Sequence, residues 1–270
     1  MRDFFIDTAN IESIKKIVGK LEDKINLNQI KGVTTNPNAF SKINEPNLGK
    51  WIETAQEISE FIYSFRGDSK GEVHIQLPNS QMNIDEALLF AEYISKLPND
   101  KITVGMKIPP YLVLLKNIDE VKKLVKTNVT GISDHATALK CISYGVDYVS
   151  LIPGRMEEVG IEAQNLMAYL FSANHNETKI ISGSMRTLEQ LIWTFQLNTI
   201  PTIGEKVFDL MFESENINSV LSIDYTEEFN TNEFSPLIKE ESINLSVDFF
   251  KQMDQLGETA HKEFKEQLQH

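Results

Sequence analysis

The stretch Ile102-Thr103-Val104-Gly105-Met106-Lys107-Ile108 is followed by Pro109-Pro110. It is the part of the sequence that says most about the fold and the chemistry of this chain. The run is mostly apolar, so it predicts a buried strand, and the prolines end it. Lys107 stands inside that strand, where burying an ammonium group is costly. Desolvation lowers a lysine pKa, and a neutral lysine attacks carbonyl carbon to form an imine. The alternatives are a lysine that extends to the rim or that pairs with a buried carboxylate.

Strand and helix patterns alternate along the chain on both sides of this stretch. Further strands are expected over residues 4–6, 30–34, 73–77, 129–132, 148–152, 179–182 and 198–201. Helical periodicity is expected over residues 10–21, 83–97, 112–126, 134–144, 156–171, 187–196 and 205–212. Asn10 and Asn83 are residues of the type that begins a helix, because an asparagine side chain accepts from free backbone N–H groups.

Eight strand–helix units fit within about 230 residues, the size of a (β/α)8 TIM barrel. The competing arrangement is a doubly wound open sheet. No Gly-x-Gly-x-x-Gly follows the first strand, and eight strands is long for that class. We therefore predict an α/β chain with a barrel over residues 1–230. Residues 231–270 are predicted to form a C-terminal helical extension packed on the barrel, after a polar loop near residues 230–236.

Composition excludes several classes of partner. The 270 residues carry a formal net charge of −13, so the chain lacks the basic surplus that neutralises nucleic-acid phosphates. No run of about 18 apolar residues is available to span a membrane. The start, Met1-Arg2-Asp3-Phe4, lacks the apolar run of a signal peptide. The lone Cys141 excludes an internal disulfide and is compatible with a reducing compartment, so we expect a cytoplasmic protein.

Polar residues cluster at the carboxyl ends of the predicted strands, where barrels place their functional groups. In chain order they are Asp7, Thr35, Asn36, Gln76, Lys107, Thr130, Ser150, Arg155, Ser184 and Arg186. These residues also have structural interpretations that involve no function: Asp7 could cap a helix, Asn36 could lie in a turn, and the arginines could be surface charges. The functional interpretation depends on these residues sharing one rim.

Such a rim supports carbonyl chemistry centred on Lys107. A neutral Lys107 attacks a ketose carbonyl, and the resulting imine accepts electrons when the neighbouring carbon–carbon bond breaks. Asp7, with the Thr130 hydroxyl and the Gln76 amide, handles protons and positions water.

Binding groups complete the predicted site. Asn36 and Ser150 hydrogen-bond substrate hydroxyls, while Arg155 and Arg186 clamp a phosphate through bidentate contacts. A metal-dependent alternative needs several histidine ligands. Only His74 and His135 lie near the predicted rim, so no metal is expected. No dinucleotide or P-loop motif is present, so no cofactor is expected either.

Four motifs resemble the transaldolase family, which includes transaldolases and the smaller fructose-6-phosphate aldolases. They are Phe5-Ile6-Asp7-Thr8-Ala9-Asn10, Gly32-Val33-Thr34-Thr35-Asn36-Pro37, Met106-Lys107-Ile108-Pro109 and Gly183-Ser184-Met185-Arg186. The resemblance covers residues 3–228 and implies a (β/α)8 barrel with a Schiff-base lysine on strand four. Residues that match the family's site are Lys107, Asp7, Asn36, Thr130, Ser150, Arg155 and Arg186.

The resemblance implies transfer of a dihydroxyacetone unit between sugar phosphates in the pentose phosphate pathway, without a cofactor. Sedoheptulose 7-phosphate and glyceraldehyde 3-phosphate would give erythrose 4-phosphate and fructose 6-phosphate. The alternative is an aldolase-type lyase that releases dihydroxyacetone, and a third reading is a barrel that binds sugar phosphates without catalysis. The family also forms oligomers, so a homo-oligomer of unspecified number is compatible with the resemblance.

This chain departs from the transaldolase pattern at three places. Gln76 stands where transaldolases have a strand-three glutamate, as in the aldolases, and Glu72 takes that place only if the strand shifts by four residues. Ile152 stands where the family has Phe or Tyr, and an isoleucine cannot hydrogen-bond a catalytic water. Ser184-Met185-Arg186 replaces a Ser-Phe-Arg or Ser-Phe-Lys, and its arginine favours a phosphorylated donor.

Overall fold

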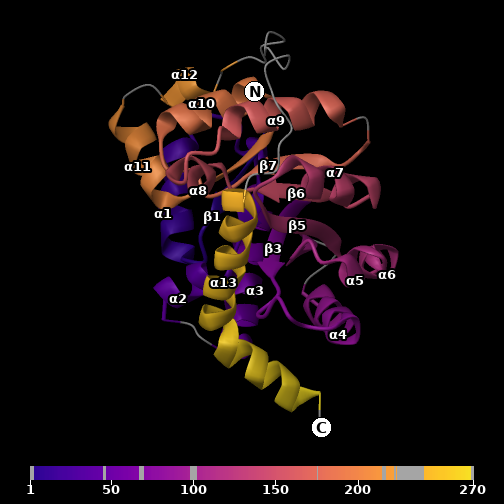
Figure 1. Cartoon of the computed structure of the whole chain (residues 1–270). Helices are drawn as coiled ribbons and strands as arrows, with labels where there is room; N and C mark the ends of the chain where they lie inside the picture. The colour runs from indigo at the N-terminus through magenta and orange to yellow at the C-terminus, as the bar shows by residue number, and fades with distance from the viewer. Residues whose placement is uncertain are drawn as a thin grey trace.

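The computed structural model describes residues 3–44, 47–66, 70–97, 102–174, 176–214, 217–221, 223 and 240–268. Eight parallel strands pair in chain order, and β8 pairs with β1 to close a barrel (Figure 1). The strands are β1 (Phe4–Asp7), β2 (Ile30–Thr34), β3 (Gly71–Gln76), β4 (Ile102–Ile108), β5 (Lys126–Ile132), β6 (Tyr148–Leu151), β7 (Lys179–Ser182) and β8 (Ile200–Ile203). The predicted (β/α)8 TIM barrel is confirmed.

Helices cover the outside of the barrel. They are α1 (Ile11–Leu21), the 3-10 helix η1 (Leu27–Gln29), α2 (Pro37–Lys42), α3 (Leu48–Arg66), α4 (Ile84–Ser95), α5 (Leu112–Leu115), α6 (Ile118–Lys122), α7 (His135–Ser143), α8 (Pro153–Glu158), α9 (Ala163–Ala173), α10 (Leu188–Gln196), α11 (Glu205–Glu213), α12 (Ile217–Leu221) and α13 (Glu240–Gln267). The two predicted N-caps are confirmed, since Asn10 accepts from two backbone N–H groups and Asn83 forms a capping box with Glu86.

Two predicted helices were wrong in their extent. The stretch 112–126 breaks at Asn117 into α5 and α6, and Lys126 already belongs to β5, where it pairs with Gly105. The stretch 156–171 is interrupted at Gly160, whose φ of 76° ends the α8 turn before α9 begins. The predicted helices also omitted α2 and α3, which follow β2, although Leu48, Trp51, Ala55, Ile58 and Ile62 recur at helical spacing along α3.

Three predicted strands also began at the wrong residue. β3 starts at Gly71, two residues before the expected 73. β5 starts three residues before the expected 129, because the Thr127 side chain and N–H both bind Asp147 and hold the polar start of the strand in register. β8 starts two residues after the expected 198, because Asn198 has a left-handed φ of 55° that belongs to a turn.

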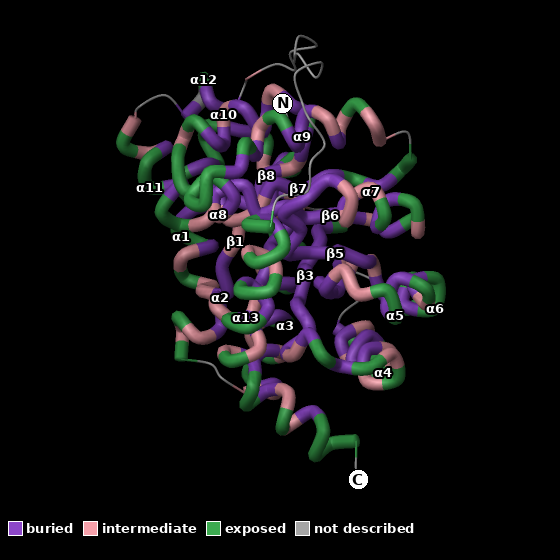
Figure 2. Tube along the Cα trace, in the orientation of Figure 1, coloured by how far each residue is buried: buried purple, intermediate pink, exposed green. Residues whose placement is uncertain are grey.

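The main hydrophobic core lies between the barrel and its helices, where the strands and the inward faces of the helices are buried (Figure 2). A second, smaller cluster of Phe5, Tyr148 and Ile181 fills the barrel interior. The His74 ring lies 4.9 Å from the Phe5 ring and 5.1 Å from the Tyr148 ring. Gly105 makes room for it, since a Cβ there would lie 2.5 Å from the imidazole.

The long helix α13 crosses the carboxyl ends of the strands, in front of the barrel in Figure 1. The Ser246 hydroxyl binds Ser133 at 2.6 Å, and the Asp254 carboxylate accepts from the N–H and hydroxyl of Ser80 at 2.6 and 2.7 Å. The predicted loop at 230–236 lies outside the described residues. In the described ranges, no helix combines the length and apolarity needed to cross a membrane.

Candidate active site

A small pocket of about 30 Å³ lies at the carboxyl ends of the strands, beneath α13. Six of the ten residues expected at this rim line it: Asp7, Asn36, Lys107, Thr130, Ser150 and Ser184. The other lining residues are Thr34, Asn128, Leu151, Ile152, Ile181, Gly183, Thr202 and Phe249. The lining does not include Thr35, Gln76, Arg155 or Arg186. The barrel therefore brings together side chains from seven strands or the loops after them, plus one from α13.

Lys107 lies near the carboxyl end of β4. Only 7% of the residue is exposed, and its Nζ donates to the backbone carbonyl of Thr35 at 3.1 Å. Burial lowers the pKa of Lys107 below its ordinary 10.5, while the charge of Asp7 acts in the opposite direction. The amine thus meets a condition for nucleophilic attack, because a larger fraction is unprotonated than for a lysine in water.

Asp7 stands at the end of β1 and accepts a hydrogen bond from the Thr34 hydroxyl at 2.8 Å. It does not cap the following helix, because Asn10 does so. Asn36 does two things at once: its side-chain oxygen caps α2 by accepting from Ala39 N–H at 2.9 Å, and the residue lines the pocket. The cap fixes the Asn36 side chain and leaves its amide NH2 as the group free of that role.

Gln76 is the register partner of Lys107 on the neighbouring strand. Its side chain is buried, and within the described part of the chain its Oε1 has no hydrogen-bond partner. Glu72 lies at the other end of β3, opposite Thr103, so the geometry favours Gln76 over Glu72 as the strand-three neighbour of the lysine. The Thr35 hydroxyl donates to the His74 carbonyl, so Thr35 offers Lys107 its backbone oxygen and not its side chain.

Asn128 is a pocket residue that sequence reasoning missed. It is fully buried, lies opposite Lys107 on β5, and accepts from the Ser150 hydroxyl at 2.6 Å. A signal was available, because Asn128 stands two residues before Thr130 and a strand places such residues on the same face. Ile152 lines the pocket as an apolar wall.

The loop after β7 is held in an uncommon conformation. Ser184 has a φ of 56°, which a residue with a side chain rarely adopts. The loop also passes close to α8, since a Cβ on Gly154 would lie 1.9 Å from the Ser184 carbonyl oxygen. Gly154 therefore allows the approach that brings Ser184 to the pocket.

The two arginines lie together beside the pocket. The Arg155 guanidinium lies 5.2 Å from the centre of the Phe249 ring and donates to Gln252 at 3.0 Å. The Arg186 side chain is about half exposed, and its Nε lies 3.5 Å from Glu158 Oε1. Burial and then the charge of Arg186 lower the pKa of Arg155. Two like charges held near each other favour an anion between them.

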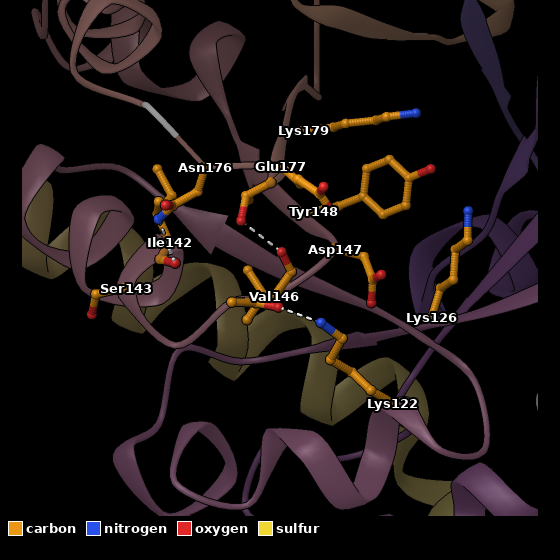
Figure 3. Close-up of a pocket in the computed structure, with 12 residues that line it drawn as sticks. Lys122, Lys126, Ile142, Ser143, Val146, Asp147, Tyr148, Asn176, Glu177 and Lys179 are labelled. Atoms are coloured by element: carbon orange, nitrogen blue, oxygen red, sulfur yellow. Dashed lines mark hydrogen bonds between the residues drawn. The ribbon is translucent and has the colours of Figure 1, made fainter.

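A larger hollow of about 650 Å³ opens at the opposite end of the barrel (Figure 3). Its lining includes Lys126, Asp147, Tyr148 and Lys179, at the starts of β5, β6 and β7. Catalytic groups of this fold stand at the carboxyl ends of strands, so the smaller pocket is the candidate active site. Among the described residues, no three His, Cys, Asp or Glu side chains are grouped to hold a metal ion.

Comparisons with known proteins point to one family. The profile described as Transaldolase/Fructose-6-phosphate aldolase matches residues 4–270. A "Probable transaldolase" of Clostridioides difficile (strain 630) is 34% identical over 215 residues, which cover 78% of this chain and 89% of that protein. A "Probable transaldolase" of Brachyspira hyodysenteriae (strain ATCC 49526 / WA1) is 32% identical over 187 residues, covering 68% of this chain and 76% of that protein.

A solved structure supports the fold alone. The tryptophan synthase A-subunit from Pyrococcus furiosus superimposes with a TM-score of 0.52 at 10% identity, covering 82% of this chain and 96% of that one. The profile match and the two relatives identify the family, whereas this distant structural likeness identifies only the fold. The chain belongs to the transaldolase/fructose-6-phosphate aldolase family.

Proposed function

We propose that this protein is a transaldolase that moves a dihydroxyacetone unit between sugar phosphates through a Schiff base on Lys107. The reaction would convert sedoheptulose 7-phosphate and glyceraldehyde 3-phosphate to erythrose 4-phosphate and fructose 6-phosphate in the pentose phosphate pathway. The observation that supports it best is the buried Lys107, with a lowered pKa, in a pocket with Asp7 and Thr130. The proposal includes a cytoplasmic location, which the buried free thiol of Cys141 supports.

The proposed chemistry begins when the neutral Lys107 amine attacks the donor's carbonyl carbon. Loss of water leaves an imine, and the bond between the third and fourth carbons breaks as its electrons flow toward the imine nitrogen. The aldose product leaves after its oxygen gives up a proton, and Asp7, the carboxyl group whose charge acts on Lys107, is assigned to take it. The remaining enamine adds to the acceptor aldehyde, and water then releases the new ketose from Lys107.

Substrate binding is assigned to the remaining pocket and rim residues. Asn36, Ser150 and Ser184 line the pocket with polar groups suited to sugar hydroxyls. Thr35 contributes through the backbone carbonyl that holds Lys107. Arg155 and Arg186, whose like charges lie beside the pocket, are assigned to the phosphate.

The second candidate is an aldolase-type lyase, which releases dihydroxyacetone instead of transferring it. Gln76, beside Lys107 in register, favours this alternative because the aldolases have glutamine there. Ile152 and Phe249 favour transfer, since an apolar wall does not hold a water molecule that would end the reaction early. The two functions differ in the fate of the enamine: a transaldolase adds it to an acceptor aldehyde, whereas the lyase protonates and hydrolyses it.

Borohydride trapping tests the proposal. Reduction in the presence of fructose 6-phosphate should attach one sugar-derived adduct to the peptide that contains Lys107, read by mass spectrometry. Product should form only when erythrose 4-phosphate or another aldose phosphate is added. The matched control is Lys116→Met, which removes an exposed lysine near α5, beside Lys107→Met, which should abolish the adduct.

Two results would change the assignment. Dihydroxyacetone released without an acceptor would assign the lyase. The absence of an adduct on Lys107 under both conditions would exclude the imine mechanism and leave a barrel that only binds sugar phosphates.

A further inference from the structure

A line of buried polar side chains runs through the barrel interior from the pocket toward the opposite end. The Ser150 hydroxyl donates to Asn128 Oδ1 at 2.6 Å, and Asn128 Nδ2 lies 3.0 Å from His74 Nδ1. The other ring nitrogen of His74, Nε2, lies 2.9 Å from Glu72 Oε2. Each of the four residues is less than 5% exposed. The pocket is thus connected to the start of β3 by three successive hydrogen bonds.

The Glu72 end of this line is surrounded by donors. Lys31 and Lys126 each bring an ammonium to 3.0 Å from Glu72 Oε1, and the Tyr148 hydroxyl lies 2.9 and 2.8 Å from the two carboxylate oxygens. In Figure 3 the Tyr148 hydroxyl and the Lys126 ammonium point to the same side. Burial by itself would raise the pKa of Glu72, but the hydrogen bond from His74 and the nearby positive charges lower it well below its usual range. Glu72 is therefore an ionised group that only accepts hydrogen bonds.

The acceptor at Glu72 decides which ring nitrogen of His74 carries the proton. Burial, the largest influence, lowers the pKa of His74, the hydrogen bond and charge of Glu72 raise it, and the charges of Lys107 and Lys126 lower it. The net pKa lies below its ordinary 6.5, so at neutral pH the ring carries one N–H. Because Glu72 accepts, that N–H is on Nε2, and Nδ1 is left as an acceptor. Asn128 must then present its NH2 to His74 and its oxygen to Ser150.

The direction of donation continues to the pocket. The single proton of the Ser150 hydroxyl is used on Asn128 Oδ1, so its lone pairs are the groups left for a ligand. With the opposite tautomer of His74, Asn128 would turn over, and Ser150 would accept from Asn128 and donate to the pocket. The hydrogen-bond acceptor at Glu72 therefore determines whether the Ser150 hydroxyl, on another strand, accepts from the pocket or donates to it.

We propose that Glu72 and His74 are positioning residues, which fix the orientation of the Asn128 amide and thereby present Ser150 to the substrate as a hydrogen-bond acceptor. The substrate group that fits is a sugar hydroxyl that donates its proton to Ser150. The identity of that substrate rests on the proposed function, whereas the polarity of the line does not.

Glu72→Gln is the informative variant. The two lysines can only donate, so the carboxamide oxygen of the variant must face them, and its NH2 must face His74 Nε2. The His74 proton then moves to Nδ1, and the whole line reverses. The matched control is Tyr148→Phe, which removes another hydrogen bond from the same carboxylate without changing what His74 meets.

The tautomer is read directly by nitrogen-15 NMR of protein labelled at histidine, with the His74 signals assigned by their loss in His74→Asn. We expect an Nε2–H tautomer in the wild type and in Tyr148→Phe, and an Nδ1–H tautomer in Glu72→Gln. Because one reversed hydrogen bond is at stake, kcat/KM for fructose 6-phosphate should fall about tenfold in Glu72→Gln and stay within about threefold in Tyr148→Phe. Borohydride trapping on Lys107 should persist in both variants.

An Nδ1–H tautomer in the wild type would overturn the inference even if Glu72→Gln failed to fold. So would a Glu72→Gln enzyme whose kcat/KM matches that of Tyr148→Phe. If the wild type forms no adduct on Lys107, the proposed function fails, and the tautomer measurement alone still decides the polarity of the line.

Discussion

Asp254 holds the middle of α13 to the barrel, and we predict that Asp254→Ala releases the helix. The carboxylate accepts two hydrogen bonds from Ser80, at 2.6 Å from its N–H and 2.7 Å from its hydroxyl. Each hydrogen bond to a charged group contributes about 1.5–3 kcal/mol. Asp254 is only half-buried, so water replaces part of what is lost, and we expect docking of α13 to weaken by about 3 kcal/mol.

Hydrogen exchange read by mass spectrometry measures this loss where it occurs. A loss of about 3 kcal/mol corresponds to roughly 100-fold faster exchange of the α13 amides. The matched control is Asp248→Ala on the same helix, whose carboxylate is exposed and lies 3.6 Å from Lys251. An exposed pair of this kind contributes less than about 1 kcal/mol, so exchange should change by no more than about fivefold. Equal exchange rates in the two variants would refute the reasoning.

Three further predictions follow from the site and the core. Burial lowers the pKa of Lys107 below 10.5, so between the lowered pKa and about 10.5 the unfolded chain holds a proton that the native lysine has lost. The free energy of unfolding should therefore rise with pH over that range. Lys107→Met should lack this slope and be more stable by about 1–3 kcal/mol at pH 7, as measured by urea midpoints across the pH range. Arg155→Ala should raise KM for fructose 6-phosphate about 10- to 100-fold and leave KM for unphosphorylated fructose unchanged, in a steady-state assay of the two donors. Burial raises the pKa of the Cys141 thiol to about 12, so iodoacetamide at pH 7 should label it only as fast as the protein unfolds; rapid labelling of the native protein would contradict its burial.

The parts of the fold that depend on neighbouring residues were predictable from sequence. The bounds of β2, β4 and β7 were correct because each is a short apolar run with polar residues or prolines at its ends. The break at Asn117 was not predictable from periodicity, because apolar residues on both sides of it continue a helical pattern.

The site was predictable where it depends on strand ends, and not where it depends on distant packing. Six expected residues line the pocket because parallel strands in a barrel all end at the same face. Phe249 could not be placed there, because nothing in the periodicity of a helix tells which strand ends it will cover. The contacts of Glu72 were equally hidden, since they depend on the register of strands far apart in the chain.

The way α13 is attached has a consequence for the kinetics of folding. The contact of Ser246 with Ser133 joins residues 113 positions apart, and that of Asp254 with Ser80 joins residues 174 apart. Farther along α13, the Glu263 carboxylate accepts from the Leu48 N–H at 2.8 Å, across 215 positions. Closing such long loops costs entropy, and that cost is lowest once the barrel has already brought the partner residues together. Because Phe249 comes from the same helix, the pocket is complete only after this step. The recovery of activity on refolding therefore reports the arrival of α13, not the formation of the barrel that carries Lys107.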